Sequence, residues 1–138
     1  MRAFVISLGF IALLAIAASG PSRAFEPNCD NPTSQVEMTF CAGKDYEAAD
    51  TELNRIYARV RAEAKNFDAS AGPYNNQSAA DLLLEAQRAW ITFRDKACDY
   101  ETSLWQGGTG ASMASLLCLA RLTRERTKDL RDTLGHGG

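Results

Sequence analysis

The fold of this chain is decided by one stretch, Ala86-Gln87-Arg88-Ala89-Trp90-Ile91-Thr92-Phe93-Arg94-Asp95-Lys96-Ala97-Cys98. The stretch has the pattern of an amphipathic helix with an aromatic centre and a cysteine at its far end. On a period of 3.6 residues, one stripe holds Leu83, Gln87, Trp90, Arg94 and Cys98. Because two of these five side chains are polar, the stripe predicts either a buried polar network or a binding site.

Two further helices are predicted on either side of this one. Before it, Thr33 or Ser34 can cap a helix, with Glu37 placed as in a capping box, and the helix continues to about Phe67 with a bend near Gly43. The central helix begins at Ser78 or Asp81 and runs to about Trp105. The last helix begins with Ser112 as its cap and ends at Gly135. The chain is therefore predicted to be all-α.

The connections between the helices are short. Residues 68–78 contain Gly72-Pro73 and Asn75-Asn76, and residues 106–110 form a glycine-rich turn. Short connections join antiparallel neighbours, so we expect an antiparallel three-helix up-down-up bundle with a long first helix.

The first 24 residues have the pattern of a secretory signal peptide. Arg2 precedes an apolar run over residues 3–18, Gly20-Pro21 breaks the run, and a cut is expected after Ala24. The domains are then a signal peptide over 1–24 and a helical domain over 25–138. An uncleaved anchor is the alternative, but the run is shorter than the roughly 20 residues that a membrane helix needs.

We expect the processed chain to be periplasmic or secreted, with no stable membrane anchor, because Cys29 lies beyond the cut and is not placed for lipidation. Residues 25–138 carry 13 basic and 17 acidic side chains. This mild acidity argues against nucleic acid as a partner and is compatible with a basic protein.

Four cysteines lie in the exported part of the chain: Cys29, Cys41, Cys98 and Cys118. An even number in an oxidising compartment indicates two disulfide bonds. Zinc is the alternative, but the spacings are too wide for a CxxC knuckle and the only histidine, His136, lies in a Gly-rich tail. We expect no metal and no cofactor.

The hairpin geometry favours one pairing of these cysteines. If Trp105 and Ser112 flank the last turn, Cys98 faces about position 119, one residue from Cys118. Cys41 would lie about 10 Å along the helix axis from the level of Cys98, which leaves it to Cys29. The pairing stays open, because all four cysteines cluster at one end and a bend in the first helix would change it.

The same geometry places four polar residues between the first two helices: Asp50, Asn54, Gln87 and Arg94. Arg94 can bind Asp50 through paired hydrogen bonds. We interpret this polar seam mainly as a structural network that fixes helix register. A small polar pocket at the bundle surface is the alternative.

The aromatic residues divide into two groups. We expect Trp90 and Phe93 in the core. Trp105 ends its helix beside the glycine turn, where partial exposure is the alternative to a core position, and exposed aromatic side chains are common anchors of protein interfaces. The candidate partner-binding residues are Trp105, Gly107, Gly108 and Thr109.

The sequence contains no arrangement that predicts catalysis. There is no nucleophile triad, no GxSxG, no Walker loop and no GxGxxG. Asp95, Asp99 and Glu101 lie close together, and paired carboxylates can hydrolyse glycosides. Charges near a helix end are usually solvated, however, and we expect no enzyme.

Taken together, several motifs resemble the lysozyme inhibitor LprI-like family, with its LprI N-terminal-type domain. They are Cys41-Ala42, Tyr46, Ala49-Asp50, Leu53-Asn54, Tyr57, Ala86-Gln87-Arg88-Ala89-Trp90-Ile91, Phe93-Arg94-Asp95, Cys98, Gly107-Gly108, Cys118 and Arg126-Thr127-x-x-Leu130. The resemblance covers nearly all of residues 25–138 and implies a small exported helical protein. The family takes its name from a mycobacterial lipoprotein that inhibits lysozyme, whereas this sequence lacks the lipidation cysteine.

The resemblance implies an exported, periplasmic inhibitor of lysozyme or a related peptidoglycan-cleaving enzyme, acting by binding. Its partner would be a protein, a lysozyme in particular. The alternative is a non-inhibitory envelope protein that binds another periplasmic protein, or a small ligand at the polar seam.

Overall fold

The computed structural model describes residues 26–135, and the expected signal peptide lies outside them. Three helices follow one another: α1 (Gln35–Ala71), α2 (Ala79–Ser103) and α3 (Ala111–Thr133). There is no strand in this part of the chain, and none of the three helices is long and apolar enough to cross a membrane. The prediction of an all-α, three-helix bundle is confirmed.

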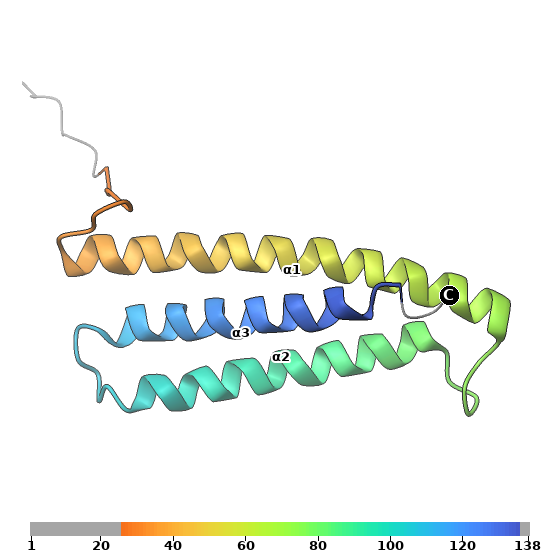
Figure 1. The fold of residues 1–138 in the computed structure, drawn as a ribbon. Helices are drawn as coiled ribbons and strands as arrows, with labels where there is room; N and C mark the ends of the chain where they lie inside the picture. The colour runs from red at the N-terminus through yellow and green to blue at the C-terminus, as the bar shows by residue number, and fades with distance from the viewer. Residues whose placement is uncertain (1–25, 136–138) are drawn as a thin grey trace, which may run out of the picture.

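The helices run up, down and up, so that α1 and α3 are parallel and α2 is antiparallel to both (Figure 1). In that view α2 forms one edge of the bundle and α3 lies between the other two helices. The most extensive packing is between α1 and α3.

The helix starts follow the capping residues of the sequence at two of three places. Ser34 caps α1, its Oγ accepting from the Glu37 amide, and Glu37 accepts from the Ser34 amide in return. Backbone N–H donation from Thr33 and Ser34 lowers the pKa of Glu37. Ser78 caps α2. The predicted cap Ser112 is wrong: α3 already begins at Ala111, because the preceding turn passes directly into the helix.

The core forms two adjoining clusters that share one aromatic ring. Leu53, Ile56 and Leu130 centre the first cluster, and the second contains Cys98, Cys118 and Leu122. Trp90 is half-buried and packs against both clusters. The indole of Trp90 therefore joins the two parts of the core, as expected of a residue at the centre of the amphipathic stretch.

Two disulfide bonds brace one end of the bundle. Cys29 pairs with Cys41, with Cα atoms 5.4 Å apart, and Cys98 pairs with Cys118, at 5.6 Å. The favoured pairing is confirmed. We call this the disulfide end; it holds the start of α1, the end of α2 and the start of α3.

Candidate functional site

The turn between α2 and α3 closes the disulfide end. Its backbone is tightly hydrogen-bonded: the Gln106 amide donates to Ser103, the Gly108 amide to Trp105 and the Ala111 amide to Gly108, at 2.9–3.1 Å. Gln106 and Gly107 have φ angles of 47° and 73°, in the left-handed region that favours glycine. The predicted partner-binding residues Trp105, Gly107, Gly108 and Thr109 all lie exposed on this turn.

Trp105 is held against the turn rather than projecting freely. A Cβ atom added at Gly110 would lie 2.7 Å from Cζ3 of the Trp105 indole, so the ring packs directly on the Gly110 backbone. The side chain is nevertheless 49% exposed. Trp105 therefore presents one part of its ring to solvent from a fixed position. Tyr100 and Leu104, which are also exposed, lie close by in the sequence.

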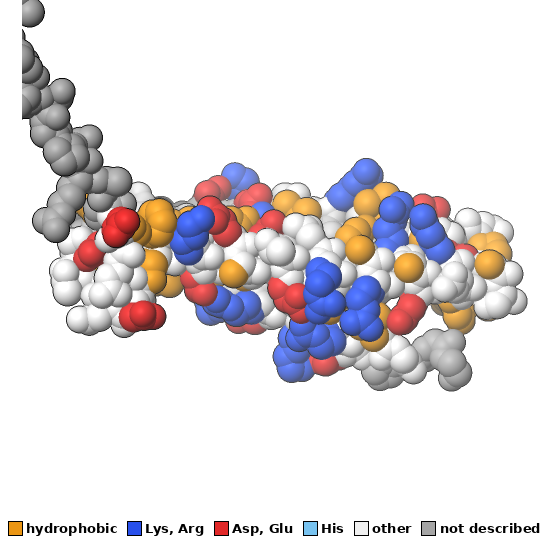
Figure 2. Space-filling model, turned by 90° about the horizontal axis from the view of Figure 1, so that it is seen from above, with side chains coloured by type: hydrophobic (Ala, Val, Ile, Leu, Met, Phe, Trp, Pro, Cys, Tyr) orange, Lys and Arg blue, Asp and Glu red, His pale blue; other side chains and the backbone are white. Residues whose placement is uncertain are grey.

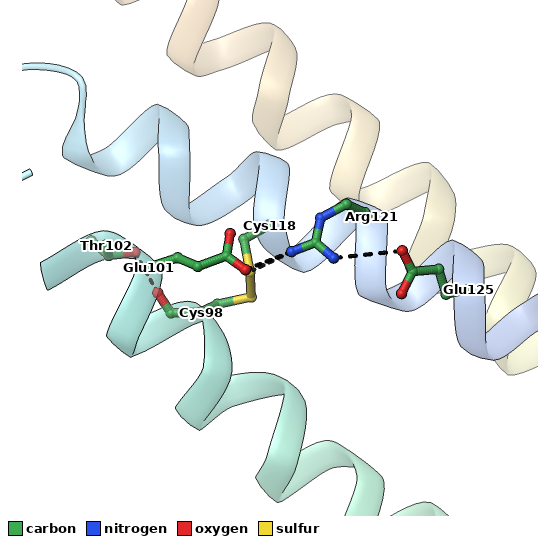
Figure 3. Close-up of polar contacts among 6 residues, drawn as sticks. All are labelled: Cys98, Glu101, Thr102, Cys118, Arg121 and Glu125. Carbon is green, nitrogen blue, oxygen red and sulfur yellow. Dashed lines mark hydrogen bonds and ion pairs between the residues drawn. A yellow bond between two sulfur atoms is a disulfide. The ribbon is translucent and has the colours of Figure 1, made fainter. Parts of the chain in front are cut away.

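Contacts between α2 and α3 hold the base of the turn (Figure 3). Cys98 and Cys118 are both buried. Beside their bond, Nη2 of Arg121 lies 2.6 Å from Glu101 and 3.8 Å from the Cys118 sulfur. The Thr102 hydroxyl donates to the Cys98 carbonyl at 2.6 Å. A covalent bond and an interhelix ion pair thus fix the helix ends that carry the turn.

The charges of the described residues are divided unevenly along the bundle. Residues 26–50 and 92–121, which form the half nearer the disulfide end, hold nine acidic and four basic side chains. Residues 51–91 and 122–135 hold eight acidic and nine basic side chains. In Figure 2 most of the Lys and Arg side chains lie toward the half away from the disulfide end. The turn is therefore displayed by the acidic half of the molecule.

The predicted polar seam does not form a single pocket. Arg94 is buried, with its guanidinium 5.7 Å from the Tyr46 ring and 5.2 Å from the Trp90 ring. Its close ion pair, at 2.8 Å, is with Asp95. Asp50 lies at 3.8 Å from Arg94 and accepts a hydrogen bond from Asn54. Arg94 thus makes cation–π contacts with two rings and a close ion pair with the residue that follows it.

Gln87, the fourth residue of the predicted seam, is bound elsewhere. Its Oε1 accepts from Nε of Arg126 on α3, at 3.1 Å. Gln87 precedes Arg94 by about two helix turns, so the two side chains lie at different levels along α2. The seam is two separate contacts, one between α1 and α2 and one between α2 and α3.

Phe93 was expected in the core, and that prediction is wrong, because its side chain is 60% exposed.

The three neighbouring carboxylates Asp95, Asp99 and Glu101 each pair with a different basic side chain: Arg94, Lys96 and Arg121. Among residues 26–135, no group of three or more His, Cys, Asp or Glu side chains could hold a metal ion.

The sequence reasoning missed a set of ion pairs between the parallel helices. Glu52 of α1 binds Arg131 of α3 at 2.6 Å, and Asp45 pairs with Arg124. Hydrogen bonding from Arg55, supported by Arg131, lowers the pKa of Glu52 to about 2. Both interhelix pairs span 79 residues. The sequence did contain a signal for these pairs, because Asp45 and Glu52 have the same seven-residue spacing as Arg124 and Arg131.

The geometry defines a small, disulfide-braced helical bundle with a rigid turn at its acidic end. The model of the family described as lysozyme inhibitor LprI matches residues 29–130. The chain belongs to this family.

Two relatives, both uncharacterized proteins, extend the comparison. R02472 of Rhizobium meliloti (strain 1021) is 38% identical over 136 residues, covering 97% of this chain and 96% of the relative. YecT of Escherichia coli (strain K12) is 26% identical over 105 residues, covering 69% of this chain and 65% of that protein. No solved structure matches the chain.

Proposed function

We propose that this protein is an exported inhibitor of a lysozyme, acting in the periplasm or outside the cell by binding to the enzyme. The observation that carries the proposal is the match of residues 29–130 to the lysozyme inhibitor family. Two disulfide bonds in a small domain add support for export, because such bonds persist in oxidising compartments.

We assign the enzyme contact to the turn at the disulfide end. Its half-exposed Trp105 has the character of an interface anchor, since aromatic side chains dominate binding energy at protein interfaces. Because the disulfide Cys98–Cys118 and the packing on Gly110 already hold the turn, binding would cost little conformational entropy. The acidic half that carries the turn would attract a lysozyme with a basic surface.

A turbidity assay tests inhibition directly. Lysis of a cell-wall suspension by a c-type lysozyme is followed while the oxidised protein is added up to molar excess. We expect lysis to slow in proportion to the enzyme bound, and the inhibition to weaken between about 50 and 200 mM salt, where exposed charges are increasingly screened. The absence of inhibition against c-type, g-type and bacterial muramidases alike would overturn the proposal.

A pair of variants tests the assigned contact. We expect Trp105→Ala combined with Thr109→Ala to raise the inhibition constant at least about tenfold, the loss typical of a strong anchor residue. The matched control is Tyr74→Ala, which removes an exposed aromatic side chain from the loop at the opposite end of the bundle. If the double variant keeps its helical circular dichroism and inhibits fully, the contact lies elsewhere even though the protein is an inhibitor.

A further inference from the structure

The second helix carries a second apolar stripe, on the side that the bundle does not cover. We call it the outer stripe, and it consists of Leu82, Ala86, Ala89, Phe93, Ala97, Tyr100 and Leu104. Tyr100 and Leu104 are 66% and 64% exposed, and of the seven only Ala97 is partly buried. At about 100° per residue, the stripe is centred about 120° around α2 from the buried residues Gln87, Arg94 and Cys98.

About half of the exposed large hydrophobic residues lie on this helix or on the two residues that follow it, Leu104 and Trp105. Eleven large hydrophobic side chains are exposed in the described part of the chain, and six of them lie between residues 82 and 105. By contrast, α3 exposes only Leu117 among its described residues. The outer stripe thus sits on the helix at the edge of the bundle in Figure 1.

The spacing of the outer stripe reads the same in both directions. Its successive steps are four, three, four, four, three and four residues, with Phe93 at the centre. A twofold interface must bring each residue i to a residue j and each j back to i. A palindromic stripe on one helix satisfies this condition when two copies of the helix cross antiparallel at Phe93.

We propose that the protein associates with a second copy of itself through this stripe, as an antiparallel dimer with its twofold axis at Phe93. Phe93 then meets Phe93 of the partner subunit, Ala86 faces the larger Tyr100 of the partner subunit, and Leu82 faces Leu104 of the partner subunit. Placing small side chains opposite large ones lets the two surfaces interlock.

Charged side chains border one edge of the stripe. Glu85 and Lys96 border its solvent edge. In the antiparallel pairing Glu85 lies between the levels of Asp99 of the partner subunit and Ser103 of the partner subunit, and Lys96 lies between those of Arg88 of the partner subunit and Thr92 of the partner subunit. These charges are exposed to solvent, where salt screens the repulsion between like charges.

The size of the contact sets the expected strength. From Leu82 to Leu104 the stripe is about 33 Å long, and a helix is about 10 Å wide. A contact of that extent lies at the small end of specific interfaces. We therefore expect monomer and dimer to exchange in the micromolar concentration range. This inference does not rest on the proposed function, since Trp105 and the turn lie beyond the end of the stripe.

Sedimentation equilibrium of the oxidised protein across about 1–500 µM tests the proposal, a range that spans weak specific association. We expect the average mass to rise with concentration toward twice the monomer mass. Phe93→Asp, which sets two carboxylates against each other on the axis, should raise the dissociation constant at least tenfold. The matched control is Val36→Asp on α1, a residue of similar exposure (64%) off the stripe, which should change it less than twofold. A monomeric mass throughout, or equal effects of both variants, would overturn the proposal.

Cysteine substitutions test the orientation. Phe93→Cys should oxidise to a dimer with itself. Ala86→Cys should cross-link only when mixed with Tyr100→Cys, with peptide mapping used to verify the two native disulfides. Efficient cross-linking of Ala86→Cys to itself would show parallel packing and contradict the twofold axis at Phe93. If the protein is monomeric and Phe93→Asp impairs lysozyme inhibition instead, the stripe contacts the enzyme and the dimer proposal is wrong.

Discussion

The two interhelix connections lie at opposite ends of the bundle and are held by different forces. At the disulfide end, Cys98–Cys118 and the ion pair of Arg121 with Glu101 fasten the helices that carry the turn. At the other end, Asp68 of α1 accepts hydrogen bonds from the amides of Ala79 and Ala80, at 2.6 and 3.1 Å. The loop between them closes on itself through paired backbone hydrogen bonds of Tyr74 and Gln77.

The two connections therefore differ in role: the first only joins two helices, whereas the second also presents a side chain to solvent. At the α1–α2 connection, Asp68 of α1 and the cap residue Ser78 accept hydrogen bonds from the free amides at the start of α2. The Cys98–Cys118 bond fixes the helices that carry the α2–α3 turn. The exposed part of Trp105 is therefore not needed to hold the bundle together. A half-exposed aromatic side chain held against the turn is the kind of feature that a binding protein needs, and this supports placing the function at the disulfide end.

The largest effect is expected from removing the buried disulfide. Cys98→Ala combined with Cys118→Ala should lower the free energy of unfolding by about 3 kcal/mol, because the unfolded chain regains the entropy of a 20-residue loop. Urea denaturation followed by circular dichroism measures the change. Inhibition of lysozyme should weaken in the same variant, since the turn would lose its brace.

The other disulfide provides the control for that variant. Cys29→Ser combined with Cys41→Ser should cost clearly less, because the exposed lead-in around Cys29 would be freed in the folded as well as in the unfolded state. Equal losses from both pairs would mean that the lead-in packs as firmly as the α2–α3 turn, and would contradict this expectation.

An intermediate effect is expected at the opposite end. Asp68→Ala should lower the free energy of unfolding by about 1–2 kcal/mol, since two amides at the start of α2 lose their acceptor. Asp68→Asn, which keeps one side-chain oxygen, should lose less. Hydrogen exchange at Ala79 and Ala80 locates the effect, and unchanged protection of both amides in Asp68→Ala would contradict it.

The smallest effect on stability is expected at Gly110. Gly110→Ala should displace the Trp105 ring, because the added methyl would lie 2.7 Å from it, yet the half-exposed ring can move away at a cost below about 1 kcal/mol. The measurable change is a red shift of Trp105 fluorescence in a Trp90→Phe background. Gly43→Ala is the matched control: its methyl meets Leu116 at an ordinary 3.8 Å, and it should stabilise α1 slightly.

The sequence predicted the features that depend on distance along the chain. The capping box of Ser34 and Glu37 needs only a three-residue spacing, and the Cys98–Cys118 bond follows from folding one hairpin back on itself. Both are local consequences of helix geometry, and both are confirmed.

Features that depend on which face of a helix is covered could not be predicted in the same way. α2 has two apolar stripes, and periodicity alone does not say that Trp90 turns inward while Phe93 turns outward. The predicted seam places Gln87 against the first helix, whereas its partner Arg126 lies on α3. The rotation of α2 about its own axis is set by the joint packing of three helices.

The order of the cysteines has a consequence for how the chain becomes oxidised. Four cysteines allow three pairings, and the protein uses the one in which each cysteine joins its nearest neighbour in sequence, Cys29 with Cys41 and Cys98 with Cys118. A chain that meets an oxidant from its N-terminus onward can close the first bond long before Cys98 emerges. Correct pairing then requires an oxidase but no isomerase, so maturation of this protein is expected to depend on thiol oxidation alone.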